Sequence, residues 1–118
     1  MGAKDEVGRR GEALAAAYLA EHGLEILARN WRCPYGEIDI VAREGRTIVI
    51  AEVKTRSGLG YGHPFEAITP LKLARLHRLA GLWRAEHPDV TGTLRIDAVA
   101  VIVVPGTPPL IEHLAGVA

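Results

Sequence analysis

The pattern of apolar and polar positions predicts a β-sheet that occupies the middle and the end of the chain. Four stretches are rich in β-branched and other apolar residues, and Gly- or Pro-containing segments separate them. They are residues 25–32, 37–43, 46–54 and 93–104. The last is continuously apolar from Ala98 to Val104, which is typical of a strand covered on both faces. Residues 110–113 add a short edge strand.

Two further stretches predict helices. Residues 5–22 are rich in Ala and Leu and end before Gly23. The second helix spans residues 70–86, where Thr69 is the N-cap and Pro70 occupies the first turn. Its apolar arc consists of Leu73, Leu76, Leu79, Ala80 and Trp83. The order α-β-β-β-α-β(-β) predicts an α/β fold with a mixed central sheet between helices, as a single domain over residues 1–118. Its last helix is expected to form a right-handed crossover between parallel strands.

Composition narrows the functional classes. The 118 residues contain 14 basic and 14 acidic side chains, which excludes a polybasic tail but not a local basic face. Cys33 is the single cysteine, so an internal disulfide and a thiolate zinc cluster are both excluded. The sequence shows neither a signal peptide nor a membrane span, and we expect a cytoplasmic protein without a membrane partner.

The register of the predicted hairpin decides whether its charged side chains meet. If Glu44–Gly45 is a two-residue turn, Asp39 lies opposite Ile50, on the same face as Glu52 and Lys54. Asp39 and Glu52 are then diagonal neighbours, ~7–8 Å apart at the backbone. A slip of one residue would send Asp39 to the other face.

These residue types are suited to metal-dependent hydrolysis. The carboxylates of Asp39 and Glu52, with the backbone carbonyl of Val53, are hard oxygen ligands for Mg²⁺ or Mn²⁺. The Lys54 ammonium can hold a water molecule or a transition-state oxygen, so the set suits attack on a phosphodiester. The alternative interpretation, in which Glu52 and Lys54 are surface partners on an edge strand, stays open.

Glu12 is a further candidate ligand. If the first helix lies over the hairpin, Glu12 reaches the metal directly or through a water molecule. Gly8 and Gly11 would then permit close approach to a backbone or a phosphate. The alternative is a solvated Glu12 balanced by Arg9 or Arg10.

Several basic and aromatic residues are candidates for contact with nucleic acid. They are Arg9, Arg10, Arg56, Tyr61, Lys72 and Arg75. In the glycine-rich loop over residues 57–64, Tyr61 can stack on a base. The alternatives are a plain connector for the loop, solvated arginines, and a Lys72 stem that packs along the edge of the core. Asp97 is expected to pair with Arg95 inside the protein.

Three motifs together resemble the YraN-like family of small bacterial proteins. They are Gly8-Arg9-Arg10-Gly11-Glu12, then Gly36-Glu37-Ile38-Asp39-Ile40-Val41, then Glu52-Val53-Lys54-Thr55-Arg56. This family is similar in pattern to archaeal Holliday-junction resolvases of the restriction-endonuclease-like, PD-(D/E)XK, superfamily. The resemblance implies Mg²⁺-dependent cleavage with Asp39 and Glu52 as metal ligands and Lys54 as the catalytic lysine. It matches Glu12 to the early helical glutamate of the resolvases. Ile38 stands where the superfamily has proline.

The sequence therefore favours a metal-dependent nuclease that acts on DNA, including branched DNA, with little sequence specificity. Resolvases act as dimers on the two symmetric strands of a junction, so the resemblance also implies a homodimer. Two alternatives stay open. One is a non-catalytic nucleic-acid-binding or scaffold protein that keeps the fold; the other is a hydrolase of small phosphoesters, which needs a deep enclosed pocket.

Overall fold

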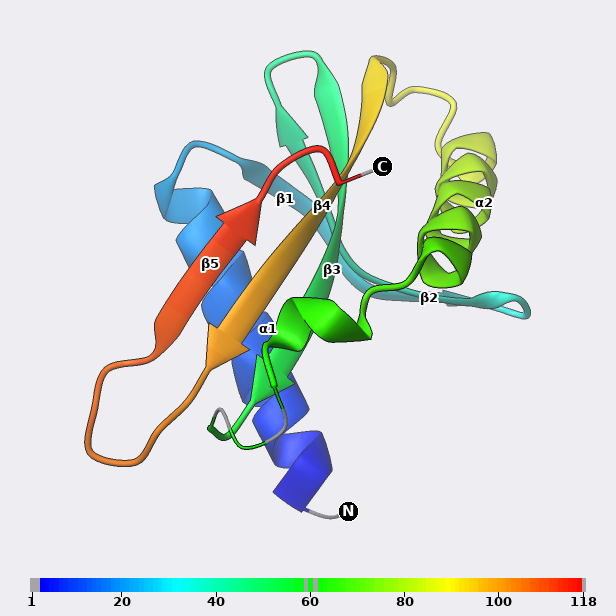
Figure 1. Ribbon diagram of the computed structural model, residues 1–118. Coiled ribbons are helices and arrows are strands. Elements are labelled where there is room, and N and C mark those ends of the chain that lie inside the picture. Colours follow the sequence, from blue (N-terminus) through cyan, green and yellow to red (C-terminus); the bar gives the residue numbers. More distant parts are fainter. Residues whose placement is uncertain (1–2, 59, 61, 118) are drawn as a thin grey trace.

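A five-stranded mixed sheet lies between two long helices. The computed structural model describes residues 3–58, 60 and 62–117. Its elements are α1 (Ala3–Glu21), β1 (Glu25–Cys33), β2 (Gly36–Glu44), β3 (Thr47–Arg56), the 3₁₀ helix η1 (Pro64–Ala67), α2 (Pro70–Glu86), β4 (Thr93–Ile102) and β5 (Leu110–Leu114). The strands lie in the order β1-β2-β3-β4-β5, and only the β3–β4 pair is parallel. The predicted α/β class, element order and mixed sheet are confirmed (Figure 1).

Each face of the sheet carries its own apolar core. On one face the buried side of α1 packs against alternate residues of β2, β3 and β4; the cluster includes Ala15, Leu19, Ile40, Val49, Ala51, Val99 and Val101. On the other face α2 packs on the intervening residues; this cluster includes Leu76, Leu79, Trp83, Ile48, Ile50 and Ile96. Strand β4 is buried on both faces, as its continuous apolar character predicts, and ends at Ile102 rather than Val104. Among the described helices, none is both long and apolar enough to cross a membrane.

The register of the β2–β3 hairpin differs from the prediction. Glu44 pairs with Thr47, so the two-residue turn is Gly45–Arg46 and not Glu44–Gly45. Glycine suits the first turn position, where φ is +59°. Glu44 remains in the strand, where its Oε1 accepts a hydrogen bond of 2.9 Å from Arg95 Nη1. The shift moves each β3 partner by two residues, so the paired side chains from Ile40 to Glu44 keep their expected faces.

Glycine 11 sets how closely α1 approaches the sheet. Gly11 is buried, and a Cβ atom built there would overlap the side chain of Thr55 on β3. A Cβ at Gly8, by contrast, would meet nothing within 4 Å. A close approach therefore occurs at Gly11 but not at Gly8, and its partner is the side chain of Thr55 rather than a backbone or a phosphate. This contact places the next residue, Glu12, against the sheet.

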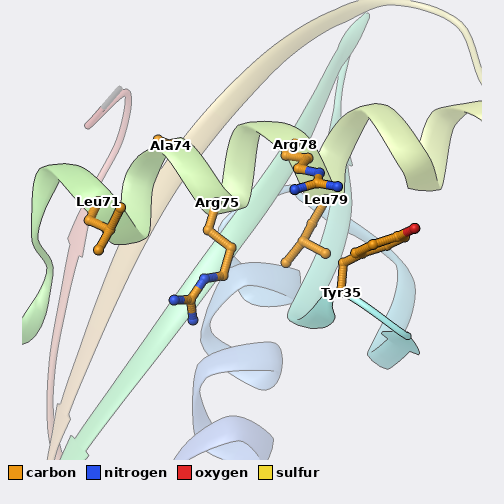
Figure 2. Close-up of a pocket in the computed structure, with 6 residues that line it drawn as sticks. All are labelled: Tyr35, Leu71, Ala74, Arg75, Arg78 and Leu79. Carbon is orange, nitrogen blue, oxygen red and sulfur yellow. The ribbon is translucent and has the colours of Figure 1, made fainter.

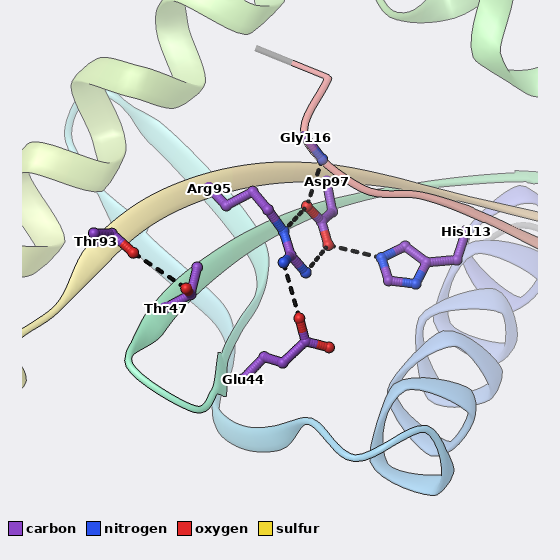
Figure 3. Close-up of polar contacts among 7 residues, drawn as sticks. All are labelled: Glu44, Thr47, Thr93, Arg95, Asp97, His113 and Gly116. Carbon is purple, nitrogen blue, oxygen red and sulfur yellow. Dashed lines mark hydrogen bonds and ion pairs between the residues drawn. The ribbon is translucent and has the colours of Figure 1, made fainter.

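A buried carboxylate on β4 accepts four hydrogen bonds, two of which connect this strand to β5 and to the segment after it. Asp97 is fully buried, and its two oxygens accept hydrogen bonds from Arg95 Nε (2.8 Å) and Nη2 (3.0 Å), His113 Nε2 (2.7 Å) and the Gly116 backbone N–H (3.0 Å) (Figure 3). The predicted Arg95–Asp97 pair is confirmed. Burial alone would raise the pKa of Asp97, but these hydrogen bonds outweigh burial and hold the pKa below its ordinary value.

The Gly11 contact leads to a stability prediction. Gly11→Ala should lower the free energy of unfolding by about 1–3 kcal/mol, because the new methyl group forces α1 or Thr55 to shift. Chemical denaturation monitored by circular dichroism measures the change. The matched control is Gly8→Ala on the same helix, which should stabilise by about 0.5–1 kcal/mol because alanine is the better helix former. Equal effects of the two substitutions would contradict the proposed tight packing.

Candidate metal and nucleic-acid site

Strands β2 and β3 separate partway along their length. Their pairing ends at Ile40 and Ala51, whereas β2 stays paired with β1 as far as Gly36. Beyond the last pair, the Val53 backbone N–H donates to Asp39 Oδ2 at 2.8 Å. The aspartate side chain therefore occupies the position that a ladder carbonyl would otherwise fill. Continuing the register by one pair places Asp39 opposite Glu52, rather than on the diagonal that the sequence predicted.

Three carboxylates from two elements converge beside this separation. Three carboxylate oxygens, one each from Glu12, Glu37 and Asp39, lie within 4.8 Å of one another. Glu37 and Asp39 stand two residues apart on β2, and the close approach of α1 at Gly11 brings Glu12 to them. Glu37 is also held by Arg32, whose Nε lies 3.1 Å from its Oε2. The interpretation in which the first helix covers the hairpin is thus the one that the structure adopts.

Glu52 approaches the same aspartate from β3. Its carboxyl interacts with that of Asp39 by hydrogen bonding and charge. Lys54 follows at the next position on the same face of β3, and both side chains are partly exposed. Asp39 is thus the common neighbour of Glu12, Glu37 and Glu52.

Crowding of like charges shifts two pKa values upward. Burial, then the charge of Asp39 and hydrogen bonding to it, raise the pKa of Glu12 from 4.5 to about 7. Burial, then hydrogen bonding and repulsion with Glu52, raise the pKa of Asp39 from 3.8 to about 8. Both shifts have the direction expected when carboxylates share a site without a compensating positive charge.

The donor set fits a hard divalent cation. Carboxylate oxygens within 4.8 Å of one another are spaced to share one ion, and Mg²⁺ and Mn²⁺ prefer such ligands together with water. A backbone carbonyl is also in place. The N–H and C=O of one strand residue point toward the same neighbouring strand, so the Val53 carbonyl faces the gap that β2 leaves.

Two residues of this site were not predicted as functional. Glu37 stands two positions before Asp39, and strand alternation alone could have placed it on the same face. Asn30 on β1 adopts a left-handed backbone with φ of +55° and hydrogen-bonds to Glu12, an interaction that lowers the pKa of Glu12. Asparagine tolerates that conformation better than most residues, but its sequence position gives no sign that it reaches α1.

The residues predicted to contact nucleic acid are spread over three elements. Arg9 and Arg10 are exposed on α1, and Arg75 is exposed on α2. Arg56 Nη1 donates to its neighbouring carbonyl, Thr55 O, at 3.2 Å. Lys72 Nζ donates to Ala67 O at the end of η1 at 2.8 Å. The remaining candidate, Tyr61, lies outside the described residues.

The raised carboxyl pKa values lead to a pH prediction. The unfolded chain releases the protons of Glu12 and Asp39 near their ordinary pKa values of 4.5 and 3.8, whereas the folded protein holds them until about pH 7 and 8. The stabilisation is therefore complete below pH ~4 and is lost as pH rises through 7 and 8. In EDTA, Asp39→Asn should melt several degrees higher than wild type at pH 9, and the difference should shrink toward pH 5.

A divalent cation should reverse this effect. Mg²⁺ or Mn²⁺ should raise the melting temperature of the wild-type protein at pH 8 and should do much less for Asp39→Asn. Asp89→Asn, an exposed aspartate beyond the end of α2, is the matched control and should behave as wild type. Equal metal-induced shifts in wild type and Asp39→Asn would contradict binding at this cluster.

Proteins of similar sequence align with this chain over almost its whole length. "UPF0102 protein" from Arthrobacter sp. (strain FB24) is 57% identical over 117 residues, which cover 99% of each chain. The protein of the same name from Beutenbergia cavernae is 55% identical, again over 99% of both chains. The relative from Nocardia farcinica is 50% identical over 99% of this chain and 92% of its own.

A solved structure shares the fold. Hjc, a Holliday junction resolvase from Archaeoglobus fulgidus, superposes with a TM-score of 0.53 at 20% identity, over 90% of this chain and 73% of that chain. The expected restriction-endonuclease-like fold, with its mixed sheet flanked by helices, is thereby confirmed. The sequence profile of the uncharacterised protein family UPF0102 matches residues 11–101, which include Glu12, Asp39, Glu52 and Lys54. With that match and these relatives, the chain belongs to the uncharacterised protein family UPF0102.

Proposed function

We propose that this protein is a nuclease that requires Mg²⁺ or Mn²⁺ and hydrolyses phosphodiester bonds of DNA, including branched DNA, with little sequence specificity. The observation that carries the proposal is the position of Asp39. Its carboxylate is fixed by the Val53 N–H at 2.8 Å where two strands separate, with Glu12 and Glu37 within 4.8 Å. The fold shared with the archaeal Holliday junction resolvase supports the assignment.

The proposed ligands are Asp39, Glu52 and the Val53 carbonyl, with Glu12 bound directly or through a water molecule. Glu37 is a further candidate from the same face of β2. A bound divalent cation would activate a water molecule and neutralise charge on the phosphate. The protein itself fixes the ligands: Val53 orients Asp39, and the absence of a side chain at Gly11 keeps Glu12 within reach.

Lys54 is the proposed catalytic lysine. Its position on the same face of β3 as Glu52 would let its ammonium reach the carboxylates, where it can hold the attacking water or stabilise negative charge on a phosphate oxygen. An ammonium also limits the repulsion between the carboxylates and an incoming anionic strand.

The proposed substrate contacts are electrostatic. Arg9, Arg10, Arg56, Lys72 and Arg75 are assigned to the phosphate backbone, and Tyr61 to a base. No net positive charge is required, because phosphate binding depends on local basic residues. A homodimer would present two such sites to the two symmetric strands of a junction.

Cleavage assays test the proposal directly. Titrating Mg²⁺ or Mn²⁺ against a panel of linear, flapped and four-way-junction DNAs should yield cleavage that EDTA abolishes. Asp39→Ala and Glu52→Ala should each lose cleavage by at least about a hundredfold while DNA binding is kept, because the carboxylates act on the metal and not on the DNA.

Glu86→Ala provides the matched control, since it removes an exposed glutamate at the end of α2 and should retain full activity. DNA binding without cleavage under any metal would favour the scaffold interpretation. Cleavage of small phosphoesters but not of DNA would favour the small-molecule hydrolase.

Lys54→Met offers a separate prediction. It should lower kcat by roughly 10²–10³-fold, as the loss of one preorganised electrostatic contact does elsewhere, while leaving the metal-induced rise in melting temperature in place. Single-turnover cleavage and thermal melts measure the two effects. If Lys54→Met instead abolished metal binding, the lysine would be a structural partner of the carboxylates rather than a catalytic residue.

A further inference from the structure

We propose that a pocket between α2 and the β1–β2 turn binds one unpaired nucleotide of the DNA substrate, with its base against Tyr35 and its phosphate on Arg75. This inference rests on the proposed nuclease function and specifies which part of a branched substrate the protein recognises.

The pocket has the size and lining of a ligand site. Its volume is about 340 Å³, at the lower end of the range usual for small-ligand pockets. Six residues line it: Tyr35 from the turn, and Leu71, Ala74, Arg75, Arg78 and Leu79 from α2 (Figure 2). Three are aliphatic, two carry a guanidinium and one is aromatic. None of the six is acidic, so the lining complements an anion that has an apolar portion.

Tyr35 and Arg78 form a stacking surface at one end of this pocket. The guanidinium carbon of Arg78 lies 4.6 Å from the centroid of the Tyr35 ring. The tyrosine is nonetheless 58% exposed, and Leu71 along the same helix is 73% exposed. Aromatic rings and guanidinium planes are the surfaces on which proteins stack nucleobases, and a base must leave the duplex to reach them.

Arg75 supplies a charge that the protein itself does not neutralise. No carboxylate forms an ion pair with Arg75 in the described part of the chain. Figure 2 shows its side chain extending away from the helix axis, beside Leu79.

The pocket is fixed close to the acidic cluster. Gly36 separates Tyr35 from Glu37, and a Cβ at Gly36 would stand 3.2 Å from Leu79 Cδ1, so the start of β2 is packed directly on α2. Tyr35 in the turn and Asp39 on β2 are four residues apart, so their Cα atoms are separated by no more than about 14 Å. That distance corresponds to roughly four stacked nucleotides. A strand with its phosphodiester at Asp39 can therefore place a nearby nucleotide in the pocket.

Binding measurements without divalent metal test the inference independently of catalysis. Fluorescence anisotropy in EDTA would compare a plain duplex with the same duplex carrying a three-nucleotide unpaired flap. Wild type should prefer the flapped DNA, and Tyr35→Ala should reduce that preference by roughly five- to a hundredfold. Tyr35→Phe keeps the ring and should keep the preference.

Arg75→Gln should weaken binding to the flapped DNA more than binding to the plain duplex, and should lower the salt dependence of flapped-DNA binding by about one released ion. Arg46→Gln is the matched control: it removes an exposed arginine in the β2–β3 turn and should leave the flap preference unchanged. Thermal melts confirm that each variant is folded. A 5-iododeoxyuridine in the flap should photocrosslink to the peptide that contains Tyr35.

The inference is overturned if Tyr35→Ala and Arg75→Gln both bind flapped DNA as wild type does. An RNA flap bound more tightly than DNA, with the same dependence on Tyr35, would support the pocket and change the preferred sugar. If cleavage depends on metal but the pocket substitutions do not change DNA binding, the pocket is rejected and the nuclease proposal is retained. Tyr35-dependent binding without any cleavage would retain the pocket and remove the nuclease.

Discussion

The candidate site depends on one hydrogen bond that replaces another. Where β2 leaves β3, the Val53 N–H would lack a strand partner, and the Asp39 carboxylate accepts its hydrogen bond at 2.8 Å. An unsatisfied backbone donor in a partly buried position is costly, so this contact both terminates the ladder and fixes the carboxylate. The separation of the strands opens the space in which Glu12, Glu37 and Glu52 meet Asp39.

Two aspartates on this sheet have opposite environments. Asp97 receives four hydrogen bonds, three of them from cationic or titratable side chains, and its pKa is lowered. Asp39 receives one backbone hydrogen bond and is surrounded by carboxyls, and its pKa is raised. The first arrangement stabilises the fold. The arrangement around Asp39 destabilises the fold unless a cation neutralises the carboxylates. Such an electrostatic environment is expected of a functional site.

Much of this architecture follows from local pattern, and the rest depends on contacts between distant residues. Alternation along β2 and β3 was sufficient to bring Asp39 to Glu52, and the apolar arc of α2 was identified residue by residue. The predicted hairpin register was wrong: Glu44 stays in its strand, where it accepts a hydrogen bond from Arg95, 51 residues later. No local pattern reports that pairing.

The contributions of Asn30 and Glu37 were not predicted, because they too depend on contacts between residues from different elements. Asn30 on β1 has a left-handed backbone and hydrogen-bonds to Glu12 on α1, a contact between two separate elements. Glu37 was within the motif that carried the resemblance, yet its role beside Asp39 depends on where the helix lies. Tertiary contacts of this kind determine the membership of the site, whereas sequence periodicity determines only which face each residue occupies.

The hydrogen bond from Gly116 has a consequence for the chain end. This backbone N–H is one of the donors to the fully buried carboxylate of Asp97. The segment after β5 therefore contributes to the stability of the core, although it has no regular secondary structure. Loss of that segment would leave an enclosed negative charge short of a donor, a defect more severe than the removal of an exposed tail. β5 and the segment after it therefore hold β4 in position. Strand β3, which carries the candidate metal ligands Glu52 and Val53, pairs in parallel with β4.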